Sequence, residues 1–214
     1  MSAPRVAAHF EDLDKQAHAE RLGVWIFLAS ELLLFGGLFA LYFSYRLHFP
    51  RIFAEGVDHN ARLLGTINTF VLLAGSACAA FGVDRLRRDR VRAGQLLVGA
   101  TALTAVAFLT VKAIEYAAHL REGIGPGGAG RFFDAHPERG WAIFFTLYYA
   151  MTGLHAIHVA LGGALFAAVA AWIGRRRVGS AGAWRVELAA LYWHFVDAVW
   201  VFLWPLFYLL GSGS

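Results

Sequence analysis

The chain has 214 residues, of which 58% are hydrophobic and only 16% are charged. Its mean hydropathy of +0.53 is too high for an ordinary soluble domain, and the connecting segments are too short to hold a separate catalytic domain. The net charge of +4 comes from arginines clustered between apolar blocks, which indicates membrane topology rather than a nucleic-acid partner.

The chain is expected to begin with a polar segment and to continue as five membrane-spanning helices. Residues 1–21 lack the apolar stretch and the small-residue cleavage site of a signal peptide, so we expect a cytoplasmic N-terminal segment and an uncleaved first span. Each apolar block that follows exceeds the ~20 helical residues that cross a hydrocarbon core, and none alternates like a barrel strand. Within a single domain at 22–211, the predicted spans are about 22–45, 63–83, 91–118, 141–173 and 186–210.

The loops predict how this all-α bundle is oriented. Arginines gather after the second and the fourth span, and short arginine-rich loops belong on the cytoplasmic side. The N-terminus is then expected inside the cell and the C-terminus outside.

Small residues recur within the spans and predict surfaces where helix backbones approach closely. These groups are Gly36-Gly37, Gly75-Ser76-Ala77, Gly99-Ala100 and Gly162-Gly163-Ala164.

Ionisable residues inside the spans are Glu31, Lys112, Glu115 and Asp197. A charge at the middle of a bilayer costs at least about 3 kcal/mol, so each is expected to have a partner or a function. Lys112 and Glu115 are three residues apart on one helix face, a spacing that favours an internal ion pair. Glu31 has no opposite charge near it in the sequence. Two interpretations of it stay open: a neutral acid bonded to a neighbouring helix, or a group that exchanges protons.

His155, His158 and His194 also fall within the spans, which raises the possibility of a haem or metal site. Haem in a bundle usually needs ligands from facing helices, and only His194 lies on a different helix from the other two. Aromatic residues crowd both segments and leave less room for a macrocycle. We therefore favour buried histidines that form hydrogen bonds, and no metal ligand is assigned.

Motifs in the spans resemble one known family. The run Tyr192-Trp193-His194-Phe195-Val196-Asp197, followed by Val199-Trp200, closely resembles the last helix of subunit III of the haem–copper respiratory oxidases. Earlier spans resemble that family in the same order, with these motifs: Ser30-Glu31, Asn68-Thr69, Glu115-Tyr116 and Gly153-Leu154-His155-x-x-His158-Val159. The resemblance extends from about residue 22 over nearly all of the chain.

The resemblance implies a non-catalytic subunit of an oxidoreductase complex. In this family, subunit III has no haem, copper or catalytic centre of its own, and we expect haem and copper in partner subunits. The expected partners are catalytic subunit I, subunit II, other subunits of the respiratory complex and membrane lipids. Subunit III sustains proton uptake, protects against inactivation during turnover and holds lipids. Glu31 corresponds to the family's carbodiimide-reactive glutamate.

One departure from the family concerns lipid binding. The long form has seven helices, with a lipid-filled cleft between its first two and last five, whereas this chain begins at the equivalent of the third. Arg175, Arg176 and Arg177 are candidates for contact with the phosphates of bound phospholipid, on both charge and position.

Three functions stay open at this level. The first is subunit III of a proton-pumping cytochrome c oxidase of aerobic respiration, multi-pass in a bacterial inner (plasma) membrane, which Phe195-Val196-Asp197 and Ser30-Glu31 favour. The second is subunit III of a quinol oxidase, or the accessory homologue of nitric oxide reductases. The third is a free-standing membrane cytochrome. If the chain is subunit III of a cytochrome c oxidase, Glu31 is the one residue expected to have a proton-linked role. The expected structural polar residues are Lys112, Glu115, His155, His158, His194 and Asp197.

Overall fold

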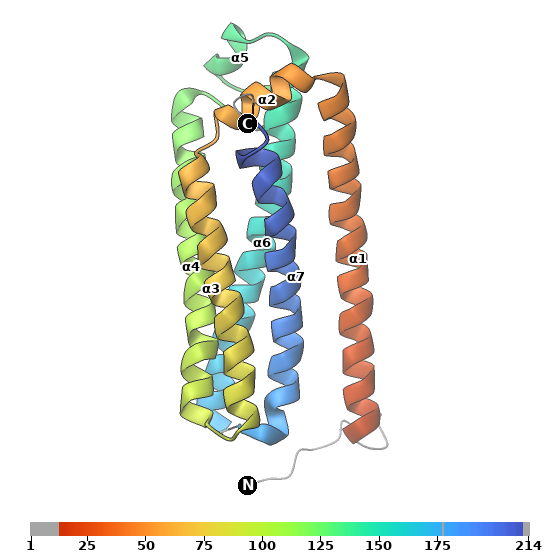
Figure 1. Cartoon of the computed structure of the whole chain (residues 1–214), viewed down its shortest axis with the longest axis vertical. Helices are drawn as coiled ribbons and strands as arrows, with labels where there is room; N and C mark the ends of the chain where they lie inside the picture. The colour runs from red at the N-terminus through yellow and green to blue at the C-terminus, as the bar shows by residue number, and fades with distance from the viewer. Residues whose placement is uncertain (1–12, 177, 212–214) are drawn as a thin grey trace.

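The computed structural model describes residues 13–176 and 178–211, and every regular element in these ranges is helical. Five long helices run along one another (Figure 1): α1 (Leu13–His48), α3 (Arg62–Arg87), α4 (Val91–Glu122), α6 (Arg139–Arg176) and α7 (Ala183–Tyr208). Within the described part of the chain, these five are long and apolar enough to cross a membrane. The predicted all-α membrane bundle is therefore confirmed, while its orientation stays a prediction.

The helices differ from the predicted spans at their ends. α1 begins at Leu13, inside the segment expected to precede the first span, and residues 1–12 lie outside the described structure. α6 likewise continues to Arg176. Hydropathy detects only the part of a helix that suits hydrocarbon, whereas lysine, arginine and glutamate are good helix formers and extend the same helix into water.

Short helices close the two ends of the bundle (Figure 1). α2 (Pro50–Asp58), η1 (Pro126–Gly128) and α5 (Arg131–Ala135) lie at the end of the bundle where α7 ends, and η2 (Ser180–Gly182) lies at the other. α2 buries Ile52, Phe53 and Val57 against the bundle. A helix of this length is too short to be detected as a span, so α2 was not predicted.

Glycines allow the central helices to approach closely. A Cβ added at Gly75 of α3 would overlap the Thr104 side chain of α4, and one at Gly163 of α6 would lie 2.6 Å from the Ala105 Cβ of α4. Close packing is thus confirmed at these two glycines. Around three other glycines, Gly36, Gly37 and Gly99, the Cβ position has open space within the described chain, so close packing there stays a prediction.

α1 lies apart from the other four long helices along much of its length (Figure 1). The Tyr42 hydroxyl of α1 donates a hydrogen bond to the Leu206 carbonyl of α7 at 2.7 Å. The buried Phe35 ring packs edge-on against His158 of α6, with ring centroids 5.3 Å apart. α1 is held to α6 and α7 by such separate contacts, and much of its apolar surface remains exposed.

The two arginine-rich loops are joined at one end of the bundle. The Ser180 backbone N–H donates to the Asp89 carboxylate at 2.8 Å, and Arg87 forms an ion pair with Glu187 at 2.6 Å. The same N–H contact keeps the pKa of the Asp89 carboxyl below its usual range. These contacts connect the α3–α4 turn to the start of α7.

Candidate functional site

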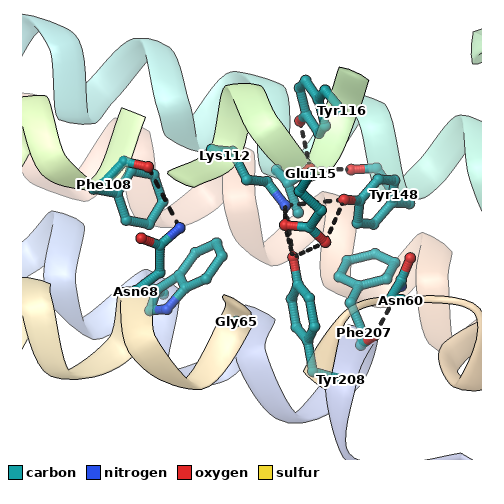
Figure 2. A network of polar contacts seen from close by, with 12 residues as sticks. Asn60, Gly65, Asn68, Phe108, Lys112, Glu115, Tyr116, Tyr148, Phe207 and Tyr208 are labelled. Atoms are coloured by element: carbon teal, nitrogen blue, oxygen red, sulfur yellow. Dashed lines mark hydrogen bonds and ion pairs between the residues drawn. The ribbon is translucent and has the colours of Figure 1, made fainter. Parts of the chain in front are cut away.

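Lys112 and Glu115 form a buried ion pair inside the bundle (Figure 2). Lys112 Nζ lies 3.1 Å from Glu115 Oε2, and the two side chains are 2% and 1% exposed. Both come from α4, where a spacing of three residues brings the side chains onto one face. The structure thus places together the two residues whose spacing favoured a pair.

Two tyrosines from other helices complete this site. Lys112 Nζ donates to the hydroxyls of Tyr148, on α6, at 3.1 Å and of Tyr208, on α7, at 2.6 Å. Each hydroxyl donates in turn to Glu115 Oε1 at 2.8 Å. The ammonium also lies 4.6 Å from the centre of the Tyr148 ring and 5.6 Å from that of Trp200.

The tyrosine cage, defined here as Lys112, Glu115, Tyr148 and Tyr208, has zero net charge. The three ammonium protons have three oxygen acceptors, and each tyrosine oxygen accepts one hydrogen bond and donates another. A network satisfied in this way ties α4, α6 and α7 together. Neither tyrosine was predicted to contact this pair, because Tyr148 and Tyr208 lie 36 and 96 residues from Lys112 along the chain.

Glu31 contacts His158 between α1 and α6. His158 Nε2 lies 2.9 Å from Glu31 Oε2, and the side chains are 9% and 16% exposed. Both residues lie near the middle of their helices. The structure therefore brings together two residues whose contact was not predicted from the sequence.

The second nitrogen of His158 restricts where the protons of this pair lie. Nδ1 lies 2.8 Å from the Leu154 carbonyl oxygen, which only accepts hydrogen bonds, so Nδ1 carries a proton. An unprotonated Nε2 and a carboxylate are both hydrogen-bond acceptors. The contact between Nε2 and Glu31 therefore requires one further proton. That proton resides either on the imidazole, opposite a carboxylate, or on the carboxyl, opposite a neutral imidazole. The pair thus shares one transferable proton without a change in its total charge.

His194 and Asp197 lie on another part of the bundle, near the middle of α7. His194 Nδ1 is 2.6 Å from the Ser76 hydroxyl of α3, and the His194 side chain is exposed on the outside of the chain. Asp197 is buried, and its Oδ1 has no hydrogen-bond partner among the described residues. The exposed position of His194 was not predicted.

His155 differs from the other two histidines. Its ring is fully buried, stacks on Trp200 with centroids 5.1 Å apart and meets the edge of Phe108. Neither of its ring nitrogens has a hydrogen-bond partner in the described ranges. The expectation that the buried histidines form hydrogen bonds is therefore wrong for His155, because aromatic contacts hold this ring instead. Within those same ranges, no group of three or more His, Cys, Asp or Glu residues is positioned to hold a metal ion.

An apolar groove of about 660 Å³ lies between α1 and the α6–α7 pair. Phe27, Leu165 and Trp172 line it, and Arg185 lies 3.8 Å from Glu20 at the groove. Tyr192 also lines the groove and donates a hydrogen bond to the backbone carbonyl of His158 at 2.9 Å, which places the groove next to the Glu31–His158 pair.

Two of the three arginines predicted to contact lipid, Arg175 and Arg176, are exposed at the end of α6 and do not line this groove. Arg177 lies outside the described residues. Among the described residues, the arginine that lines the groove is Arg185, which was not predicted to contact lipid.

These features define an all-α membrane bundle with buried polar contacts and one carboxyl–imidazole contact between α1 and α6. Residues 13–212 match the family described as Cytochrome c oxidase subunit III, and the chain belongs to that family. Membership implies association with other subunits of an oxidase. The chain is thus a subunit III of the haem–copper oxidase family.

Two kinds of relative are similar to this chain. Cytochrome c oxidase subunit 3 of Thermostichus vulcanus is 33% identical over 88% of this chain and 86% of the relative. The corresponding protein of Synechocystis is also 33% identical, over 88% of this chain and 74% of the relative. A probable quinol oxidase subunit 3 of Staphylococcus epidermidis is 29% identical over 93% of this chain and 94% of the relative.

Proposed function

We propose that this chain is the non-catalytic subunit III of a proton-pumping cytochrome c oxidase, in which oxygen is reduced to water. The haem and copper belong to the partner subunits, with catalytic subunit I and subunit II as neighbours in a bacterial plasma membrane. The motifs Phe195-Val196-Asp197 and Ser30-Glu31 favour this type over a quinol oxidase, while relatives of both types are similar to the chain. The role of the chain is to support proton uptake by the catalytic subunit.

The Glu31–His158 pair is the observation that supports this role. The pair holds one transferable proton, and Glu31 is 16% exposed although it lies at mid-helix. A carboxyl–imidazole pair accepts or releases a proton with little movement of heavy atoms, because the two sites lie within hydrogen-bond distance. The proposed function of Glu31 is to hold a proton for uptake by the neighbouring catalytic subunit.

Bound phospholipid belongs to the same proposal. The groove beside α1 is lined mostly by apolar residues, which suit an acyl chain. Arg185 also lines it and suits an anionic headgroup. Arg175 and Arg176 lie at the same end of the bundle and add positive charge there.

Glu31→Gln is expected to leave the complex assembled but to slow its proton uptake and to shorten its active life during turnover. Glutamine still donates a hydrogen bond to His158 Nε2, so the α1–α6 contact survives, but it has no proton to transfer. The measurement compares proton uptake and the decay of oxygen consumption in purified complexes with and without the change.

Ser30→Ala provides a matched control for Glu31→Gln. The Ser30 hydroxyl is the neighbouring polar group on α1, and among the described residues it donates only to the Phe27 carbonyl of its own helix. The control is expected to behave as the unmodified complex. Identical proton uptake and inactivation in the Glu31→Gln complex would show that the pair has only a structural role.

A further inference from the structure

Four polar side chains of α6 follow one another through the interior of the bundle. Tyr148, Thr152, His155 and His158 are three or four residues apart, so they share one face of the helix, with one residue on each successive turn. All four are buried. Polar and ionisable side chains are costly inside a membrane, and chains of them commonly mark the path of a proton.

These side chains join the tyrosine cage to the Glu31–His158 pair. Tyr148 belongs to the cage, where its hydroxyl donates to Glu115, and His158 at the other end of the series contacts Glu31. One turn from the cage, the Thr152 hydroxyl donates to the Tyr148 carbonyl at 2.6 Å. The remaining position, between Thr152 and the pair, is occupied by His155.

His155 is the member of this series without a protein partner. Its ring is fully buried, and among the described residues neither ring nitrogen has a hydrogen-bond partner. The ring interacts electrostatically with both Lys112, in the cage, and His158. Asn68 Oδ1 of α3 is a second buried polar atom that lacks a partner in the described ranges, and Asn68 and His155 both contact Phe108. Ordered water commonly satisfies such buried groups.

In the other direction the cage is connected to the end of the bundle where α7 ends. His119 lies one turn beyond Glu115 on α4, interacts with it electrostatically and forms a hydrogen bond with the backbone of His59. His59 lines a pocket of about 540 Å³ at this end, and most of the residues that line it are ionisable. The polar row, as we call this series of contacts, consists of His59, His119, Glu115, Lys112, Tyr148, Thr152, His155 and His158.

We propose that the polar row carries protons between the pocket at the α7 end of the bundle and Glu31, with ordered water bound at His155 as the central link. In each passage one proton enters at the pocket and one reaches the Glu31–His158 pair. The tyrosine hydroxyls suit this passage, because each accepts one hydrogen bond and donates another. The inference rests on the proposed role of Glu31, and it identifies the side of the membrane from which Glu31 receives its proton.

Carbodiimide labelling of Glu31 in the intact oxidase tests which side supplies the proton. Dicyclohexylcarbodiimide reacts with a protonated carboxyl, so labelling measured by mass spectrometry follows the protonation of Glu31. The titratable side chains that face Glu31 within the described chain are His158 of α6 and Tyr192 of α7. In liposomes that hold the complex in one orientation, labelling is expected to rise only when the pH falls on the side where α7 ends. Labelling that follows the opposite side, both sides equally or neither overturns the proposal.

His155→Phe tests the central link. Phenylalanine keeps an aromatic ring in the contacts of His155 but has no ring nitrogen, so the complex is expected to assemble and to lose the dependence of Glu31 labelling on the pH at the α7 end. His119→Phe interrupts the row beyond the cage and is expected to cause the same loss. The matched control is His194→Phe, since His194 is an exposed histidine outside the row. The proposal is overturned if either row variant retains the dependence once assembled, or if the control loses it.

An experimental structure of the oxidase tests the water at His155. At a resolution that shows water, an ordered molecule is expected within hydrogen-bond distance of at least one His155 nitrogen, because a buried neutral imidazole otherwise leaves its donor and its acceptor unsatisfied. Two nitrogens that contact only apolar atoms overturn this link.

The two proposals fail in different ways. If Glu31→Gln slows proton uptake but labelling of Glu31 does not follow the pH at the α7 end, the polar row is overturned and the proposed function stands. If Glu31→Gln changes neither proton uptake nor inactivation, the proposed function is overturned, whatever the labelling shows.

Discussion

Lys112→Met is expected to destabilise the chain by about 3–5 kcal/mol, the usual cost of removing one partner from a buried ion pair. The change leaves the Glu115 carboxylate, 1% exposed, without its counter-charge and removes a donor from both tyrosines of the tyrosine cage. The measurement is the temperature at which this chain unfolds in the purified complex.

The double change Lys112→Met with Glu115→Leu is expected to recover much of that loss, because it leaves no unpaired charge in the interior. Arg51→Ala is the matched control, since Arg51 pairs with Glu138 at 3.1 Å while the side chains are 65% and 56% exposed. An exposed pair contributes at most about 1 kcal/mol. If Lys112→Met were no more destabilising than Arg51→Ala, the tyrosine cage would not hold the bundle together.

Gly65→Ala is expected to destabilise the chain by about 1–3 kcal/mol through overpacking. A Cβ at this position of α3 would lie 2.6 Å from Cδ1 of the Tyr208 ring, whose hydroxyl contacts Lys112 and Glu115 (Figure 2). Displacement of the ring would lengthen these hydrogen bonds. Unfolding of the purified complex and the ultraviolet absorption of its tyrosines provide the measurement.

Gly99→Ala is the control for Gly65→Ala, and it is expected to stabilise the chain rather than destabilise it. Nothing lies within 4 Å of a Cβ at Gly99, so alanine only gains helix propensity, worth at most about 1 kcal/mol. Equal effects of Gly65→Ala and Gly99→Ala would contradict the close contact between α3 and the Tyr208 ring.

The sequence predicts those features that depend on local pattern. Long apolar blocks identify the five spans, since any helix that crosses the hydrocarbon needs about 20 apolar residues. The spacing between Lys112 and Glu115 favoured their pairing, since residues three apart are neighbours on a helix surface. Motifs in the last helix indicated the family that the comparison then showed.

Features that depend on helix rotation and packing could not be predicted. Glu31 and His158 are 127 residues apart, and Lys112 and Tyr208 are 96 apart. The spanning helices are apolar on all sides, because both lipid and neighbouring helices are apolar, so periodicity does not tell a buried face from an exposed one. For the same reason the sequence did not distinguish Gly75 of α3, which packs closely against α4, from Gly99 of α4, whose Cβ position has open space around it.

Purification of the chain in mild detergent, with its visible spectrum and its partners recorded together, tests the proposed function most directly. We expect the chain to co-purify with a larger subunit that carries haem, and we expect the haem absorbance to remain with that subunit when the two are separated. A stable chain that purifies alone, or a separated chain that retains stoichiometric haem, would contradict its assignment as a non-catalytic oxidase subunit.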